Sequence, residues 1–175
     1  MTFARIRSLA IVGTLVVAAL VFTLVAIGRD RQTHKPTASG CSTGVLANLR
    51  LPDEPKDIKV NVLNATDHKA LAQAVASELR ARKFNVGKVA NEAKHVDGVA
   101  VLRYGPKEVG AAWVVRAYFL NEAKLEFDVK RTDDTVDVVL GQGYKQLASF
   151  TEMRQSLVQA GPADLPPGTC DAGAV

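Results

Sequence analysis

The sequence predicts an α+β protein: a two-layer βαββαββ sandwich of the split-βαβ kind, preceded by a single N-terminal transmembrane helix. Two patterns predict this class. Stretches with alternating apolar and polar residues, typical of strands, take turns with stretches whose apolar residues recur every three or four positions, typical of helices. An uncharged run at residues 8–27 stands ahead of them and is long enough to cross a bilayer as a helix.

The uncharged run is predicted to be a signal-anchor helix that stays in the plasma membrane. No face of it is polar, which excludes a buried helix of a soluble core. Basic residues flank both ends, so the orientation follows from the N-terminal position. Residues 1–7 are expected in the cytoplasm, and the domain is expected on the extracytoplasmic side. The alternative is a cleaved signal peptide, with cleavage after Gly28 and secretion of the domain, although its usual apolar core has only about 7–15 residues.

Residues 28–56 are expected to form an extracytoplasmic tether. The first part is polar and contains Pro36 and Gly40, which are typical of a flexible linker. Residues 45–57 carry short apolar stretches and two prolines, which favour irregular structure.

The domain predicted at residues 57–147 begins with a strand and an amphipathic helix. Alternating side chains over 58–65 predict the strand. Over residues 66–84, apolar residues recur one helical turn apart, which predicts a helix with Thr66 or Asp67 as its N-terminal cap.

The rest of the domain continues the alternation. We expect two strands, a second helix opened by Pro106, and two final strands. The turn residues at 131–135 predict that the last two strands form a hairpin. A short helix and a Pro-rich tail are expected within residues 148–175. In order, these elements are predicted at 85–93, 98–105, 106–121, 124–131, 136–144 and 150–160. The sheet is expected to be antiparallel or mixed, with both helices on one face.

The charge distribution argues against nucleic acid as a partner. The formal net charge is +4, with 22 basic and 18 acidic residues. Arg5 and Arg7 precede the predicted membrane span, which leaves 20 basic residues against 18 acidic ones beyond it. A nucleic-acid-binding surface needs basic residues clustered on one face. We therefore expect a mixed surface and no nucleic acid.

The two cysteines, Cys41 and Cys170, could serve a disulfide, a metal site or lipid attachment. A lipoprotein signal places its cysteine directly after the apolar core, whereas thirteen residues separate Ile27 from Cys41. Two cysteines cannot supply four thiolate ligands, and neither has a metal-binding spacing. An even count in an exported domain predicts a Cys41–Cys170 disulfide that ties both tails together at the base of the domain. Two free thiols are the alternative.

No catalytic or metal-binding motif is visible. The letters G-x-S-x-G occur at residues 40–44, but they lie in the predicted polar tether and not at a strand-to-helix turn, where a nucleophile elbow stands; no phosphate-binding glycine loop is visible. His68 and His95 are isolated, so helix-surface or loop positions are expected for them. Asp133, Asp134 and Asp137 could suggest a cation site, but they lack an EF-hand pattern and a solvated turn explains them. The sequence therefore predicts no enzyme, no cofactor and no metal.

Three stretches carry a family resemblance. "KVNVLNATDHKALAQAVASELRARKFNV" (59–86), "VAVLRYGP" (99–106) and "AAWVVRAYFL" (111–120) resemble the LytR C-terminal domain family. Such domains begin with a V-x-V-L-N strand, continue with a helix rich in leucine and alanine, and later have a strand ending near Tyr-Gly. The family usually has glycines in the first turn and before the phenylalanine that ends the first helix. Here Asp67 and Lys83 stand near those places.

The resemblance implies an extracytoplasmic, non-catalytic binding or adaptor protein that contributes to cell-envelope integrity. Its partner would be a wall glycan, a lipid-linked precursor or a phosphotransferase of the LytR–CpsA–Psr type. The candidate contact surface is the turn formed by Arg103, Tyr104, Gly105 and Pro106. The alternative is structural: Tyr104 ends a core strand, and Gly105 and Pro106 make the turn into the second helix. The alternative function is a small hydrolase or transferase whose site has no recognisable motif. Nothing in the sequence specifies an oligomeric state.

Overall fold

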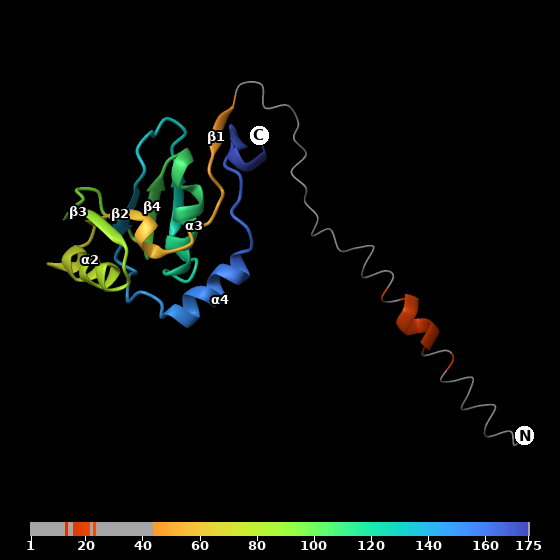
Figure 1. Ribbon diagram of the computed structural model, residues 1–175. Coiled ribbons are helices and arrows are strands. Elements are labelled where there is room, and N and C mark those ends of the chain that lie inside the picture. The colour runs from red at the N-terminus through yellow and green to blue at the C-terminus, as the bar shows by residue number, and fades with distance from the viewer. Residues whose placement is uncertain (1–12, 14–15, 22, 24–43, 175) are drawn as a thin grey trace, which may run out of the picture. The chain divides into compact units, whose positions relative to one another are not determined.

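The structure is a computed structural model that describes residues 13, 16–21, 23 and 44–174 (Figure 1). The chain divides into two compact units, Met1–Gly40 and Cys41–Val175, which are described separately. In the first unit, the described residues are helical. Residues 1–7, most of the predicted span at 8–27 and the predicted tether up to residue 43 lie outside the described residues. Within the described part, no helix combines the length and the apolar character that crossing a membrane requires.

The second unit contains a mixed five-stranded sheet with the strand order β3-β2-β6-β4-β5. β2 pairs in parallel with β3 and with β6, whereas β4 pairs in parallel with β5 and antiparallel to β6. Together with α2 and α3, these strands confirm the predicted βαββαββ order. Their bounds are β2 Lys59–Asn64, α2 Leu71–Ala81, β3 Asn85–Asn91, β4 Ala100–Tyr104, α3 Val109–Ala117, β5 Lys124–Phe127 and β6 Val136–Leu140.

One face of the sheet is covered and the other is open, as the alternating pattern predicts. Val60 and Val62 of β2 are fully buried, and they belong to one core cluster with the buried residues of both helices. α2 and α3 therefore cover the same face of the sheet. On the opposite face, Val101 and Val139 form a much smaller apolar cluster with Ala65, and polar side chains occupy the rest. Burial of valine and leucine side chains, worth about 1.5–3 kcal/mol each, holds the two layers together.

The predicted hairpin of the last two strands is wrong. β4 lies between β5 and β6, so these two consecutive strands do not pair. The turn-rich segment that joins them instead crosses the end of β4, where Arg131 Nη1 donates a hydrogen bond of 3.0 Å to the carbonyl oxygen of Arg103. The alternation of side chains specifies which face a strand buries, but not which strand it pairs with.

The first helix begins later than predicted, at Leu71, and neither Thr66 nor Asp67 caps it. The side chain of Asn64 organises the preceding turn. Its Oδ1 accepts hydrogen bonds from the backbone nitrogen (3.1 Å) and the hydroxyl (2.8 Å) of Thr66, and its Nδ2 donates to the carbonyl oxygen of His68 (2.9 Å). Because these contacts favour a turn over a helix, the helical hydrogen bonds start further along the chain.

Part of the segment predicted as a tether is folded. β1 (Val45–Ala47) pairs in parallel with β7 (Thr169–Asp171) at the C-terminal end, and Figure 1 shows the two segments side by side. The backbone nitrogen of Gly110, in α3, donates a hydrogen bond of 3.0 Å to the carbonyl oxygen of Asn48. A Cβ at position 110 would lie only 2.0 Å from the carbonyl oxygen of Arg50, so this close approach requires glycine.

Three short 3₁₀ helices and α4 complete the unit. They are η1 (Pro55–Asp57), η2 (Pro106–Glu108), η3 (Ala172–Ala174) and α4 (Phe150–Ala160). α4 confirms the predicted closing helix at residues 150–160. Its start is fixed by a capping box in which Ser149 and Glu152 each accept a hydrogen bond from the other's backbone nitrogen.

Candidate functional site

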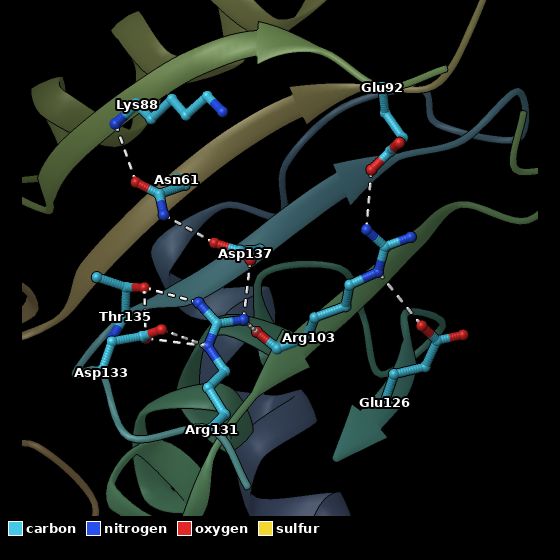
Figure 2. A network of polar contacts seen from close by, with 9 residues as sticks. All are labelled: Asn61, Lys88, Glu92, Arg103, Glu126, Arg131, Asp133, Thr135 and Asp137. Atoms are coloured by element: carbon cyan, nitrogen blue, oxygen red, sulfur yellow. Dashed lines mark hydrogen bonds and ion pairs between the residues drawn. The ribbon is translucent and has the colours of Figure 1, made fainter. Parts of the chain in front are cut away.

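The open face of the sheet carries a network of charged side chains around Arg103 and Arg131 (Figure 2). Arg103 lies on β4, whose neighbouring residues Leu102 and Tyr104 point into the core. Strand geometry therefore directs the Arg103 side chain to the open face. Arg131 reaches the same face from the segment that crosses the end of β4.

Arg131 is saturated by contacts within the chain. Its Nε donates to both carboxylate oxygens of Asp133 (2.9 and 3.0 Å), its Nη1 to Asp137 (2.8 Å), and its Nη2 to the hydroxyl of Thr135 (2.8 Å). Burial opposes the charge of this guanidinium, but the hydrogen bonds to Asp137 and Asp133 outweigh it and raise its pKa. Since the side chain is only 14% exposed, Arg131 acts as a clamp for the crossing segment and offers little to a ligand.

Arg103 joins two distant carboxylates and keeps some exposure. Its Nη1 lies 2.8 Å from Glu92 and its Nε 3.4 Å from Glu126, and its side chain is 34% exposed. The hydrogen bond from Arg103 holds the pKa of the Glu92 carboxyl below its usual value. Arg103 therefore carries a fixed charge on the open face, but Glu92 and Glu126 balance it.

The other three residues of the predicted contact turn do not form a contact surface. Tyr104 is 5% exposed and its ring centroid lies 5.7 Å from that of Phe127. Gly105 is buried against Arg131, where a Cβ would stand 2.6 Å from the carbonyl oxygen. Pro106 is buried at the start of η2. The turn is a packing element, because the crossing segment covers it, and only Arg103 stays accessible.

His95 and the aspartates at positions 133, 134 and 137 lie beside other charged side chains of the domain. The exposed His95 lies 3.9 Å from Asp67, and Asp134 forms an ion pair with Lys59. Asp133 and Asp137 both bind Arg131. In the described residues, no three histidine, cysteine, aspartate or glutamate side chains come close enough to hold a metal ion.

The strongest candidate for a binding site is an apolar groove that the sequence analysis missed. It has a volume of about 370 Å³ and lies between the η1 segment, α3 and α4. Its apolar lining includes Ile58, Val114, Tyr118, Phe150, Met153 and Leu157. The helical spacing of Phe150, Met153 and Leu157 could have indicated an apolar stripe on α4. Such a stripe has to cover the core or meet a partner.

Part of the apolar lining of the groove is exposed to solvent. Phe150 is 62% exposed, an unusual value for a large aromatic side chain. The Arg154 guanidinium lies 5.6 Å from the centroid of the Phe150 ring, and Asp53 and Glu54 are the acidic residues of the lining. No nucleophile with an adjacent base lines the groove, and its chemistry suits an apolar ligand with a polar end.

Two other cavities have charged side chains in their linings. One, of about 310 Å³, is lined by the carboxylates of Asp53, Asp57 and Glu108 together with Arg50 and Lys107. Burial, followed by the charge of Asp134, raises the pKa of Glu108 to about 6. The other cavity, of about 530 Å³, contains a single carboxylate and a single lysine in a mixed lining of Val99, Phe119, Leu120, Glu122, Gly143, Lys145 and Gln146.

Comparison with known proteins identifies the family. Residues 57–144 match the LytR_C model, described as "LytR cell envelope-related transcriptional attenuator". Since the match covers half of the chain, this protein belongs to the LytR_C family. The structure is also similar to the crystal structure of the soluble domain of a conserved hypothetical secreted protein, the Rv2700 ortholog, from Mycobacterium marinum. The TM-score is 0.54 at 28% identity, over 67% of this chain and 81% of that one. No curated protein matches this chain.

Proposed function

We propose that this chain is an extracytoplasmic, non-catalytic binding or adaptor protein of the cell envelope. Its LytR_C family and its similarity to a protein described as secreted support this placement. The combination of an apolar N-terminal run, a domain of this type and a cysteine on either side of it also resembles the mycobacterial envelope-integrity protein Cei. The proposed role is to maintain the envelope by contacting a wall glycan, a lipid-linked precursor or a LytR–CpsA–Psr phosphotransferase.

The apolar groove is the observation that carries this proposal. A cavity of about 370 Å³ with exposed Phe150 at its edge can bury part of a lipid chain or an apolar side chain of a partner protein. Its charged lining residues, Asp53, Glu54 and Arg154, can orient the polar end of the same ligand. A groove of this kind favours binding over chemistry.

The groove is tested by crosslinking in intact cells, followed by recovery of the full-length chain from membranes. Phe150→Ser should strongly reduce the crosslinked partner, because it removes the exposed aromatic edge without emptying the core. Val158→Ser is the matched control, since Val158 is 83% exposed on the same helix and does not line the groove. An equal loss of crosslinks in both variants, or no loss in either, would contradict this site.

Membrane anchoring through residues 8–27 belongs to the same proposal. The uncharged run supports it by its length. The full-length protein should stay in the membrane fraction after a carbonate wash. Release of a shortened soluble form would instead establish cleavage and secretion.

The predicted Cys41–Cys170 disulfide is likewise proposed. Cys41 lies outside the described residues, but β1 begins four residues after it, at Val45. In the β1–β7 pair, Leu46 lies opposite Cys170. Five residues, at most about 3.6 Å each, connect Cys41 to Leu46, so the bond would require this short segment to turn back toward β7.

One observation favours the alternative, a small hydrolase or transferase. Glu108 has a pKa of about 6 in a polar cavity that it shares with Asp57, and a carboxyl group of this kind can act as a general acid or base. If the cavity is catalytic, Glu108→Gln should abolish envelope function while the protein stays folded. Under the binding proposal, Glu108→Gln should behave like Glu78→Gln, a control at an exposed position, and both should retain function.

A further inference from the structure

The second surface of interest is the free edge of β3. β3 is the terminal strand of the sheet and pairs only with β2. A terminal strand presents a row of backbone N–H and C=O groups that no strand of the same sheet satisfies. Many proteins cover such an edge or keep it very short, but β3 extends over Asn85–Asn91.

The hydrogen bonds at both ends of β3 show which residues face outward. The backbone nitrogen of Asn85 donates to Ile58 (3.1 Å), and that of Glu92 donates to Asn64 (2.8 Å). Residues that point toward β2 alternate with residues that point away, apart from an irregularity in register opposite Val60–Val62. The residues whose backbone groups then point away from β2 are Val86, Val89 and Asn91.

A hollow lies beside the C-terminal part of this edge. It has a volume of about 260 Å³ and separates the C-terminal part of β3 from the first turn of α2. Its lining is formed by Ala70, Ala72 and Gln73 of the α2 side and by Val89, Ala90 and Asn91 of β3. Three of these side chains are alanine methyl groups, so the hollow has room for side chains of an added strand.

The stretch of chain that forms α2 and β3 is mainly basic, and the acidic residues that flank it, Asp67 and Glu92, lie 3.9 Å from His95 and 2.8 Å from Arg103. Between residues 69 and 91 the chain has five basic residues and one acidic residue, Glu78, which pairs with Arg82 at 3.2 Å. The other four basic side chains are exposed and have no ion pair within the described part of the chain: Lys69, Arg80, Lys83 and Lys88. The first turn of α2 has no acidic residue and no capping side chain. The mixed charge of the whole sequence conceals this cluster.

We propose that the free edge of β3 binds an extended, acidic peptide segment of another protein by strand addition. The outward backbone groups would pair with the peptide, its alternate side chains would enter the hollow beside α2, and its carboxylates would meet the unpaired lysines. A second copy of this chain is a poor occupant, because its own β3 would bring the same basic residues against them. The inference concerns a different surface from the apolar groove and stands whether or not that groove binds a ligand.

The test measures binding of a fluorescent peptide with alternating valine and glutamate to the full-length chain in detergent. The matched peptide has lysine in place of glutamate. The protein variant Lys69→Glu/Lys88→Glu reverses the charges of the two basic residues that directly precede Ala70 and Val89 of the hollow. The control Lys124→Glu/Lys130→Glu makes the same change in net charge at exposed positions on or beside β5, the opposite edge. Hydrogen exchange, read for each backbone amide, reports where the peptide lies.

The expected result is binding of the glutamate peptide alone, weakened about tenfold or more by the first variant and less than twofold by the control. The amides of Val86, Val89 and Asn91 should gain protection. Equal weakening in both variants, protection away from β3, or no binding would overturn the proposal. So would a concentration-dependent dimer with protection of β3 in the absence of peptide, or binding of polyphosphate in preference to the peptide.

Discussion

Replacement of Lys83 by glycine should stabilise the protein, because Lys83 has a backbone conformation that favours glycine. Lys83 has φ 73° and directly follows the end of α2. Its backbone nitrogen donates to the carbonyl oxygen of Arg80 (2.9 Å), and that of Phe84 donates to Leu79 (3.0 Å). These two bonds form a Schellman motif, in which the residue at the position of Lys83 is left-handed and usually glycine.

The magnitude follows from two opposing terms. A residue other than glycine loses about 1–2 kcal/mol in the left-handed region. Glycine adds conformational entropy to the unfolded chain, which reduces the gain by about 0.4–1 kcal/mol. Lys83 has an exposed side chain with no ion pair within the described part of the chain, so no contact is lost. Lys83→Gly should therefore increase the free energy of unfolding by about 0.5–1 kcal/mol. For a chain of this size, each kcal/mol raises the melting temperature by about 2–4 °C.

Urea and thermal denaturation of the full-length chain, followed by circular dichroism, measure this gain. Lys83→Ala should leave stability nearly unchanged, since alanine shares the left-handed penalty. Ala81→Gly, inside α2, should destabilise by about 1 kcal/mol. The reasoning fails if Lys83→Gly destabilises as Ala81→Gly does, or if Lys83→Ala stabilises as much as Lys83→Gly.

Three further predictions concern other parts of the fold. Replacing Cys41, Cys170 or both should lower the melting temperature by the same amount, because the same bond is lost each time. The bond closes a loop of about 130 residues, so its loss should cost up to about 5 kcal/mol. A thiol that reacts with an alkylating reagent in the native protein would contradict the bond. Because burial raises the pKa of Glu108 from 4.5 to about 6, the folded state holds its proton more tightly. Its contribution to stability should therefore be full below pH 4.5 and be lost as the pH rises to about 6, and Glu108→Gln should flatten this part of the pH–stability curve. Trp113→Phe should lower the free energy of unfolding by about 1 kcal/mol, because it removes the hydrogen bond of 2.9 Å from Trp113 Nε1 to the carbonyl oxygen of Gly161, which connects α3 to the end of α4. An unchanged midpoint of urea denaturation would show that this bond contributes nothing.

The sequence indicated the family of this protein but did not locate a binding site. The resemblance of the stretches 59–86, 99–106 and 111–120 to the LytR C-terminal domain family indicated the family that the comparison confirms. It did not locate a site, because the motifs that carry it are packing positions such as Tyr104. The glycine positions of the family were more informative. Lys83 does have the left-handed backbone that a glycine there implies, whereas in the first turn that conformation falls on Ala70 (φ 61°) and not on Asp67.

The sequence by itself determined the order of the strands and helices in the domain and which face each element buries. Those properties depend on local periodicity: the alternation over β2 and the helical spacing in α2 are complete within about ten neighbouring residues each. The late start of α2 is the local exception, because Asn64 holds the intervening turn.

Only the tertiary structure decided the strand order, the candidate binding surfaces and the pairing of β1. β4 separates β5 from β6, Arg131 clamps the crossing segment, and β1 pairs with a strand more than a hundred residues away. Each of these arrangements depends on contacts between residues far apart in the chain. Which of those contacts are favourable depends on the surfaces that remain to be buried once the local elements have formed. The apolar groove and the free edge of β3 are, conversely, two of the surfaces that no other described element of the domain covers.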